Sequence, residues 1–163
     1  MKTFKDPAAF ARFLRDKSAT LAAAQVAGLR KGAAIVEADA KARIGQYQDE
    51  AGPFPEWRDL AASTIADKER QGYGVPDPLL RNGDMRDSIE SAFRPNGFTV
   101  GSPDPVLLYQ EEGTEGPNPG PDGWHVPPRP VLGPALFTNA EKVVDAVAEE
   151  VAAWLSSTRP NRW

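Results

Sequence analysis

The chain offers few side chains that could do chemistry. His125 is the only histidine, and cysteine is absent. These counts exclude disulfides, thiolate nucleophiles, cysteine-based zinc sites and any metal site built from several histidines. They leave at most one Ser-His-Asp system, and no Gly-x-Ser-x-Gly turn is present to position a serine nucleophile. We therefore expect His125 to be a packing or hydrogen-bonding residue.

Two adjacent carboxylates, Glu111 and Glu112, invite comparison with the acid pair of a glycoside hydrolase. Neighbouring residues on a helix do not face each other, so these two cannot flank one bond as acid and base. We expect Glu111 instead to anchor the turn at Gly113 or to form an ion pair with Arg129. The sequence thus predicts a protein that is not an enzyme and that needs no cofactor and no metal.

Length and composition indicate one domain, spanning 1–163. Hydrophobic residues make up 40% of the chain and charged residues 26%, which argues against wholesale disorder. The formal net charge is −4 and no block is rich in Lys or Arg, so a dedicated nucleic-acid-binding surface is disfavoured. No run approaches the roughly 20 apolar residues of a membrane helix, and residues 1–6 hold no apolar signal core. We expect synthesis in the cytoplasm and no membrane partner.

Helical signals occupy both ends of the chain. Asp6-Pro7 is a favourable start, because Asp accepts hydrogen bonds from free N–H groups and Pro fits the first turn. We predict a short helix over 7–16 within an N-terminal arm (1–17), a long helix over 18–44 and a C-terminal helix over 134–157. The apolar stripe expected on the long helix is Val26, Leu29, Ala33, Val36, Ala40 and Ile44. The stripe expected on the C-terminal helix is Ala140, Val144, Val147, Val151 and Trp154.

Proline and glycine punctuate the middle of the chain. We predict a loop over 45–57, a weaker helix over 60–71 and a short helix over 105–112. Apolar residues over 87–93 and 97–101 suit paired strands, with turn chemistry between them. The predicted fold is therefore α+β, in which a long N-terminal helix and a C-terminal helix pack on a small antiparallel β-sheet.

The segment 113–130 is rich in Pro and Gly and is long for a simple connection, which is typical of a functional or disordered loop. Trp124 is a large apolar group in this polar context, so it either anchors a partner or folds back onto the core. The polar tail, 158–163, ends in Trp163 and could order on a partner.

Three segments in order carry a resemblance. Residues 79–89 read Leu-Leu-Arg-Asn-Gly-Asp-Met-Arg-Asp-Ser-Ile, residues 109–114 read Tyr-Gln-Glu-Glu-Gly-Thr, and residues 129–135 read Arg-Pro-Val-Leu-Gly-Pro-Ala. They resemble the L-L-R-T-G-x-L-R-x-S-I, Y-x-E-(aromatic)-G-T and R-P-F-L-x-P-A elements of the neck and minor tail-component family (tail-completion, head–tail joining) of long-tailed bacteriophages. The resemblance covers about 20–157. This chain departs from it at Glu112, at Val131 and in a longer insertion between Gly113 and Arg129.

The resemblance implies a structural virion protein of the head–tail junction, as a neck, tail-completion or tail-terminator ring component. It implies a homo-oligomeric ring, expected to be hexameric, that contacts head–tail connector and tail-tube proteins and meets DNA only as passing cargo. The expected location is the virion, in the neck or upper tail. The residues expected at subunit or partner interfaces are Arg81, Arg86, Glu111, Trp124, His125, Arg129 and Trp163.

Other interpretations remain open at this stage. Arg81 and Arg86 flank the Asn82-Gly83 turn, and turn chemistry with solvated side chains explains them more readily than contact with a neighbouring subunit. A particle-associated hydrolase would need convergent acids in a cleft. A monomeric adaptor would bind its partner through the Pro-rich loop.

Overall fold

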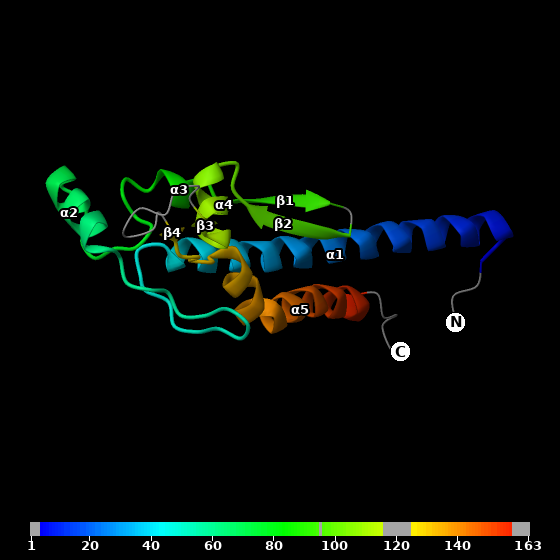
Figure 1. The fold of residues 1–163 in the computed structure, drawn as a ribbon. Helices are drawn as coiled ribbons and strands as arrows, with labels where there is room; N and C mark the ends of the chain where they lie inside the picture. Colours follow the sequence, from blue (N-terminus) through cyan, green and yellow to red (C-terminus); the bar gives the residue numbers. More distant parts are fainter. Residues whose placement is uncertain (1–3, 95, 116–124, 158–163) are drawn as a thin grey trace.

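The computed structural model describes residues 4–94, 96–115 and 125–157. Two long helices, α1 (Pro7–Arg43) and α5 (Leu132–Ser157), lie antiparallel along one another, and a β-hairpin covers another side of α1 (Figure 1). The expected α+β architecture of two helices with a small antiparallel sheet is confirmed. The first turns of α1 extend past the end of α5, so the molecule is elongated (Figure 1).

Helix α1 is continuous, and the predicted break between 16 and 18 is wrong. Asp6 starts the helix as expected, since its carboxylate accepts a hydrogen bond from Ala9 N at 2.7 Å. No Pro or Gly lies between residues 8 and 27, so nothing interrupts the backbone hydrogen bonds. The Thr20 hydroxyl bonds back to the carbonyls of Asp16 and Lys17, which keeps its donor within the helix.

Small residues set the contact between α1 and α5. A Cβ on Gly28 would lie 2.5 Å from the Cα of Val147, so the two backbones approach closely there. The expected stripe on α1 is buried from Ala33 onward. On α5 the predicted stripe is right only in part. Ala140 and Val144 are exposed, whereas Val147 lies against Gly28 and Trp154 donates to the Thr20 hydroxyl of α1. The buried positions are Pro134, Ala135, Asn139 and Ala146. Close helix approach selects these smaller side chains, which a search for large apolar residues overlooks.

The hairpin pairs β1 (Glu90–Arg94) with β2 (Gly97–Gly101), in the register Ser91 opposite Val100 and Phe93 opposite Phe98. The first strand was expected to start at Asp87. Instead a helical turn, α3 (Asp84–Asp87), comes first, because Gly83 adopts φ +94° and its carbonyl accepts from Asp87 N. The positive φ predicted for the Asn82-Gly83 turn is therefore present.

Shorter elements complete the fold: α2 (Ala62–Gln71), α4 (Pro105–Glu112), β3 (Thr114–Glu115) and β4 (His125–Val126). Helix α4 has the predicted bounds, and its Asp104 cap accepts from Val106 N. Strands β3 and β4 pair at the two ends of the Pro/Gly-rich segment, whose middle, 116–124, lies outside the described residues. Within the described chain, no helix combines the length and apolar character that crossing a membrane requires.

The core joins side chains from five segments that lie far apart along the chain: the end of α1, Trp57, Ile89, α4 and the start of α5. Trp57 lies in the segment predicted as a loop, yet it is 5% exposed and its indole N–H donates to Pro130 O at 3.2 Å. The buried apolar cluster consists of Val36, Ala40, Ile44, Trp57, Ile89, Leu107, Val131 and Ala135. Its position between α1, the hairpin and the start of α5 fixes the segments that form the candidate site.

Candidate functional site

The three segments that carry the family resemblance meet at the start of α5. Glu111, in the second segment, accepts hydrogen bonds from Val131 N at 2.7 Å and Leu132 N at 2.6 Å, in the third segment. Free N–H groups at a helix start and the helix dipole both favour a carboxylate there. Ile89 of the first segment and Val131 of the third share the buried cluster. The Glu111 carboxylate therefore caps α5 from a different part of the chain.

Arg129 binds the segment that follows Trp57 and holds it beside the start of α5. Its guanidinium donates to the carbonyls of Arg58 at 3.0 Å and Asp59 at 3.2 Å, and its backbone N–H donates to Gln110 O at 2.6 Å. The residue is 5% exposed, and burial lowers the pKa of its guanidinium. In the described part of the chain no ion pair joins Arg129 to Glu111, so that expected pairing is not formed.

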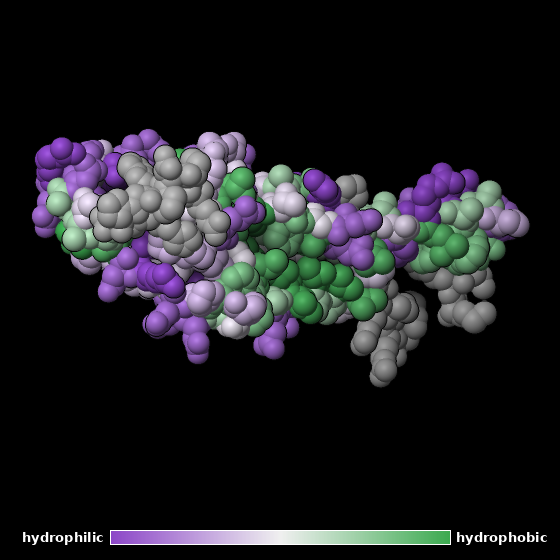
Figure 2. Space-filling view, viewed as in Figure 1, coloured by the Kyte–Doolittle hydropathy of each residue, from purple (hydrophilic) through white to green (hydrophobic). Residues whose placement is uncertain are grey.

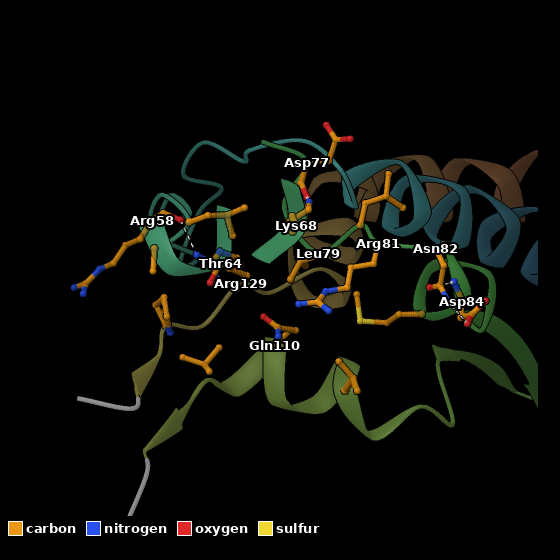
Figure 3. A pocket seen from close by; sticks show the side chains of 18 of the residues that line it. Arg58, Thr64, Lys68, Asp77, Leu79, Arg81, Asn82, Asp84, Gln110 and Arg129 are labelled. Carbon is orange, nitrogen blue, oxygen red and sulfur yellow. Dashed lines mark hydrogen bonds between the residues drawn. The ribbon is translucent and has the colours of Figure 1, made fainter. Parts of the chain in front are cut away.

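Beside this junction lies a cleft of about 610 Å³. Its walls are the segment 58–61 with α2, the segment 77–85, helix α4 and the segment 126–129. Gln110 reaches from α4 toward Lys68, Leu79 and Arg81 on the opposite side (Figure 3). All three resemblance segments thus contribute residues to one cavity, which motif order along the chain did not predict.

Several polar side chains at the cleft are buried, and their hydrogen-bond partners are backbone carbonyls or are missing from the described chain. Lys68 is 2% exposed, and its ammonium donates to the backbone carbonyl of Asp77. Burial lowers the pKa of Lys68, with the nearby Asp77 charge opposing that shift. Gln110 Oε1 and Arg129 Nε are buried and have no hydrogen-bond partner among the residues that the structure describes. Leu79 adds a positive φ of 62°, an uncommon conformation for a branched side chain.

The two arginines of the first segment have partners close by. Arg81 lines the cleft, lies 3.1 Å from the Asp67 carboxylate and stacks over the Tyr73 ring. Hydrogen bonds from Gln71 and Arg70, and to a lesser extent the Arg81 charge, hold the pKa of Asp67 below its ordinary value. Arg86 forms an ion pair with Asp87 at 2.8 Å and is partly exposed. The Arg86 contact is local to the turn, whereas Arg81 contacts residues of α2 and the segment after it. A role of either arginine at a subunit interface stays a prediction.

The remaining predicted interface residues lie around the Pro/Gly-rich segment and the tail. Trp124 and Trp163 fall outside the described residues. His125 belongs to β4, where its backbone pairs with Glu115. Of the seven predicted positions, the structure brings Arg81 and Arg129 into one cleft and places Glu111 beside it.

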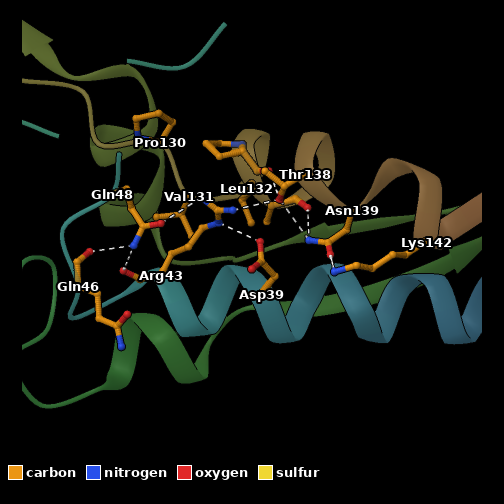
Figure 4. Close-up of polar contacts among 12 residues, drawn as sticks. Asp39, Arg43, Gln46, Gln48, Pro130, Val131, Leu132, Thr138, Asn139 and Lys142 are labelled. Atoms are coloured by element: carbon orange, nitrogen blue, oxygen red, sulfur yellow. Dashed lines mark hydrogen bonds and ion pairs between the residues drawn. The ribbon is translucent and has the colours of Figure 1, made fainter. Parts of the chain in front are cut away.

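A polar network ties the end of α1 to the start of α5. The Arg43 guanidinium donates to Asp39 at 2.9 Å, Gln48 at 3.1 Å and Thr138 at 3.1 Å (Figure 4). The buried Asn139 amide donates to Ala135 O at 2.9 Å and accepts from Lys142. These polar side chains find their hydrogen-bond partners within the chain, so we infer that the network stabilises the fold.

Large apolar side chains lie exposed on two surfaces. The α5 face carries Leu136 (50% exposed), Phe137 (52%) and Val144 (65%), and the arm tip carries Phe10 (45%) and Leu14 (50%). Figure 2 shows apolar residues gathered over α5 and at the protruding end of α1. The surfaces differ in charge. Residues 4–17 hold four basic and two acidic side chains, whereas α5 holds four acidic and one basic.

No group of three or more metal-binding side chains occurs among the residues that the structure describes. In comparisons with protein-family models, curated proteins and solved structures, nothing matches this chain.

The sequence alone did not single out Lys68 and Gln110. Gln110 lies within residues 109–114, the second resemblance segment, and this position is the one feature of the sequence that could have pointed to it. Lys68 lies on a polar helix, and nothing in its neighbours distinguishes it from a solvated lysine.

Proposed function

We propose that this chain is a structural protein of the head–tail junction of a tailed-phage particle, acting as a neck, tail-completion or tail-terminator ring component. The ordered resemblance of residues 79–89, 109–114 and 129–135 supports this role. Their meeting around the start of α5 gives the resemblance a structural basis, because the three segments form one cluster of mutual contacts. The ring is homo-oligomeric, with six copies expected.

The observation that carries the proposal is the pair of exposed apolar surfaces. Contiguous exposed apolar side chains mark interaction sites, and those on α5 and on the arm lie on different parts of the chain. A cyclic ring requires such an arrangement, because its repeated interface joins two different surfaces of the subunit. The basic arm complements the acidic α5 helix. We therefore place the arm of one copy on the α5 face of the next.

The rival functions make different demands. A hydrolase needs two free carboxylates converging in a cleft. Four aspartates line this cleft (Asp59, Asp77, Asp84 and Asp104), but Asp84 and Asp104 already accept hydrogen bonds from Asn82 and from Val106 N. An adaptor needs a binding surface without self-assembly, and the two charge-complementary surfaces favour self-assembly instead. We therefore retain the structural role as the proposal.

Cysteine cross-linking in particles tests the ring directly, since the native chain has no cysteine. The double variant Leu14→Cys/Val144→Cys would place one thiol on each proposed surface. After mild oxidation of purified particles, we expect a ladder of cross-linked subunits that ends at the ring size. Cross-links within one chain would give no ladder.

The matched control is Leu14→Cys/Thr99→Cys, in which the second thiol lies on the exposed face of the hairpin. This pair should give no ladder. If both variants remain uncross-linked in particles that contain the protein, the arm-to-α5 interface is wrong. Cross-linked dimers without higher species would indicate a two-fold contact and would contradict the ring.

A further inference from the structure

The face of α1 that packs on α5 continues along the arm, beyond the end of α5. A Cβ on Gly28 would meet the α5 backbone, and Trp154, near the end of α5, donates to the Thr20 hydroxyl. The arm then extends past α5 (Figure 1). Steps of three and four residues from Gly28 toward the N-terminus keep to this face and reach Lys17, Leu14 and Phe10. The arm therefore presents a surface suited to a second helix.

This part of α1 needs such a partner. An isolated helix of about a dozen residues is marginal in water, because its stability comes mostly from packing of its apolar face. Phe10 and Leu14 are 45% and 50% exposed. The face that they share accepts α5 in the same chain further along, so the natural occupant is α5 of another copy.

Helix α5 carries a second apolar stripe, on a side that α1 does not cover. The stripe runs at steps of three and four residues through Glu141, Val144 and Ala148, which are all exposed. Glu141 and Val144 also line a hollow on the surface of α5, together with Ala140 and Asp145. Two helices whose side chains repeat at this spacing can interlock along their length. The α5 stripe and the arm face thus have matching patterns.

Each of the two patterns includes one charged side chain, and the two charges are opposite. Lys17 follows Phe10 and Leu14 on the arm, and Glu141 precedes Val144 on α5. Neither Lys17 nor Glu141 belongs to an ion pair within the part of the chain that the structure describes. A charge within a helix contact needs a counter-charge, because it loses water there. Each helix therefore offers the counter-charge that the other requires.

Aligning these two charges decides the direction of the contact. In an antiparallel pair, Leu14 then lies opposite Val144, and the large Phe10 lies opposite the small Ala148. In a parallel pair, Phe10 would lie opposite Pro134, which is buried. Only the antiparallel alignment places exposed side chains against exposed side chains.

We propose that the arm of one copy packs antiparallel on the exposed stripe of α5 in the next copy, with Lys17 paired to Glu141 inside the contact. This inference rests on the proposed ring and specifies the register of its repeated interface. The apolar residues supply the attraction, and the ion pair selects the register, because a slipped contact would leave both charges without a partner.

Charge reversal in the Leu14→Cys/Val144→Cys chain tests the ion pair, through the same oxidation of purified particles. Lys17→Glu and Glu141→Lys each bring like charges together, so each should reduce the ladder at least about tenfold. The double reversal, Lys17→Glu/Glu141→Lys, should restore it. A single reversal that keeps the protein out of the particle counts as the same loss, and the double reversal must then return it.

The matched control is Arg12→Glu, which reverses a basic residue on the opposite side of the arm and should leave the ladder unchanged. If neither single reversal weakens the ladder, the pairing of Lys17 with Glu141 is wrong and the ring itself stands. If the single reversals weaken it but the double reversal does not restore it, the two residues do not act as a pair.

Two further cysteine pairs test the direction of the contact. Phe10→Cys/Ala148→Cys should give a ladder, because the antiparallel register places these positions opposite each other. Leu14→Cys/Phe137→Cys should give none, since position 14 then lies seven residues, or roughly 10 Å, from the residue opposite Phe137. The reverse result would overturn the antiparallel register. No ladder from any of the three pairs would contradict the arm-to-α5 contact itself, and this inference with it.

Discussion

At residue 111 a carboxylate accepts hydrogen bonds from two N–H groups of the α5 start, 2.7 and 2.6 Å away. The sequence showed that Glu111 and Glu112 cannot form a catalytic pair, but it could not identify the partner of Glu111. That partner lies 20 residues away along the chain. Local patterns reach only the neighbouring turns of a helix, so a cap donated from elsewhere in the fold escapes them.

Replacing Glu111 by Ala should lower the free energy of unfolding by about 2 kcal/mol, because two helix N–H groups lose a charged acceptor. Urea unfolding followed by circular dichroism measures this. The control is Glu112→Ala, next to it in sequence but exposed, which should change stability by less than about 0.5 kcal/mol. Equal effects of the two substitutions would show that Glu111 does not cap α5.

At the scale of elements, most helices and strands could be predicted, but the face that α5 buries could be predicted only in part. Asp6-Pro7 and Asp104-Pro105 mark the starts of α1 and α4 by local capping, which sequence alone reveals. Helix α5 has apolar residues on two faces. The close approach of α1 at Gly28 and Gly32 covers the side of α5 that holds Ala146 and leaves Val144 exposed. Helix contacts made through small residues change the hydropathy pattern of the sequence very little.

Gly28→Ala should therefore destabilise the protein by about 1–2 kcal/mol, although alanine is the better helix former. The added Cβ would meet the Val147 backbone at 2.5 Å, which forces the two helices apart. Thermal unfolding measures the change. Gly101→Ala serves as the control because a Cβ there meets nothing within 4 Å. A Gly28→Ala protein as stable as the native chain would mean that α1 and α5 do not pack this closely.

At the scale of the whole molecule, the α+β architecture followed from the order of predicted elements, whereas the cleft did not. Its walls come from segments between residues 58 and 129. Two buried atoms beside it, Gln110 Oε1 and Arg129 Nε, are notable only for lacking partners within the described part of the chain. A missing partner is a property of the folded arrangement and has no signature in sequence. The packing of α1 along α5 likewise decides which faces of α5 and of the arm stay exposed, and the sequence does not show this packing.

The central claim concerns a role in joining the head to the tail, and negative-stain microscopy of particles made without this gene tests it most directly. The account predicts filled heads and separate tails, with joined particles restored when the native gene is supplied in trans. Tails of uncontrolled length would assign the chain to the terminator position within the same role. Normally joined particles in its absence would contradict the proposed function.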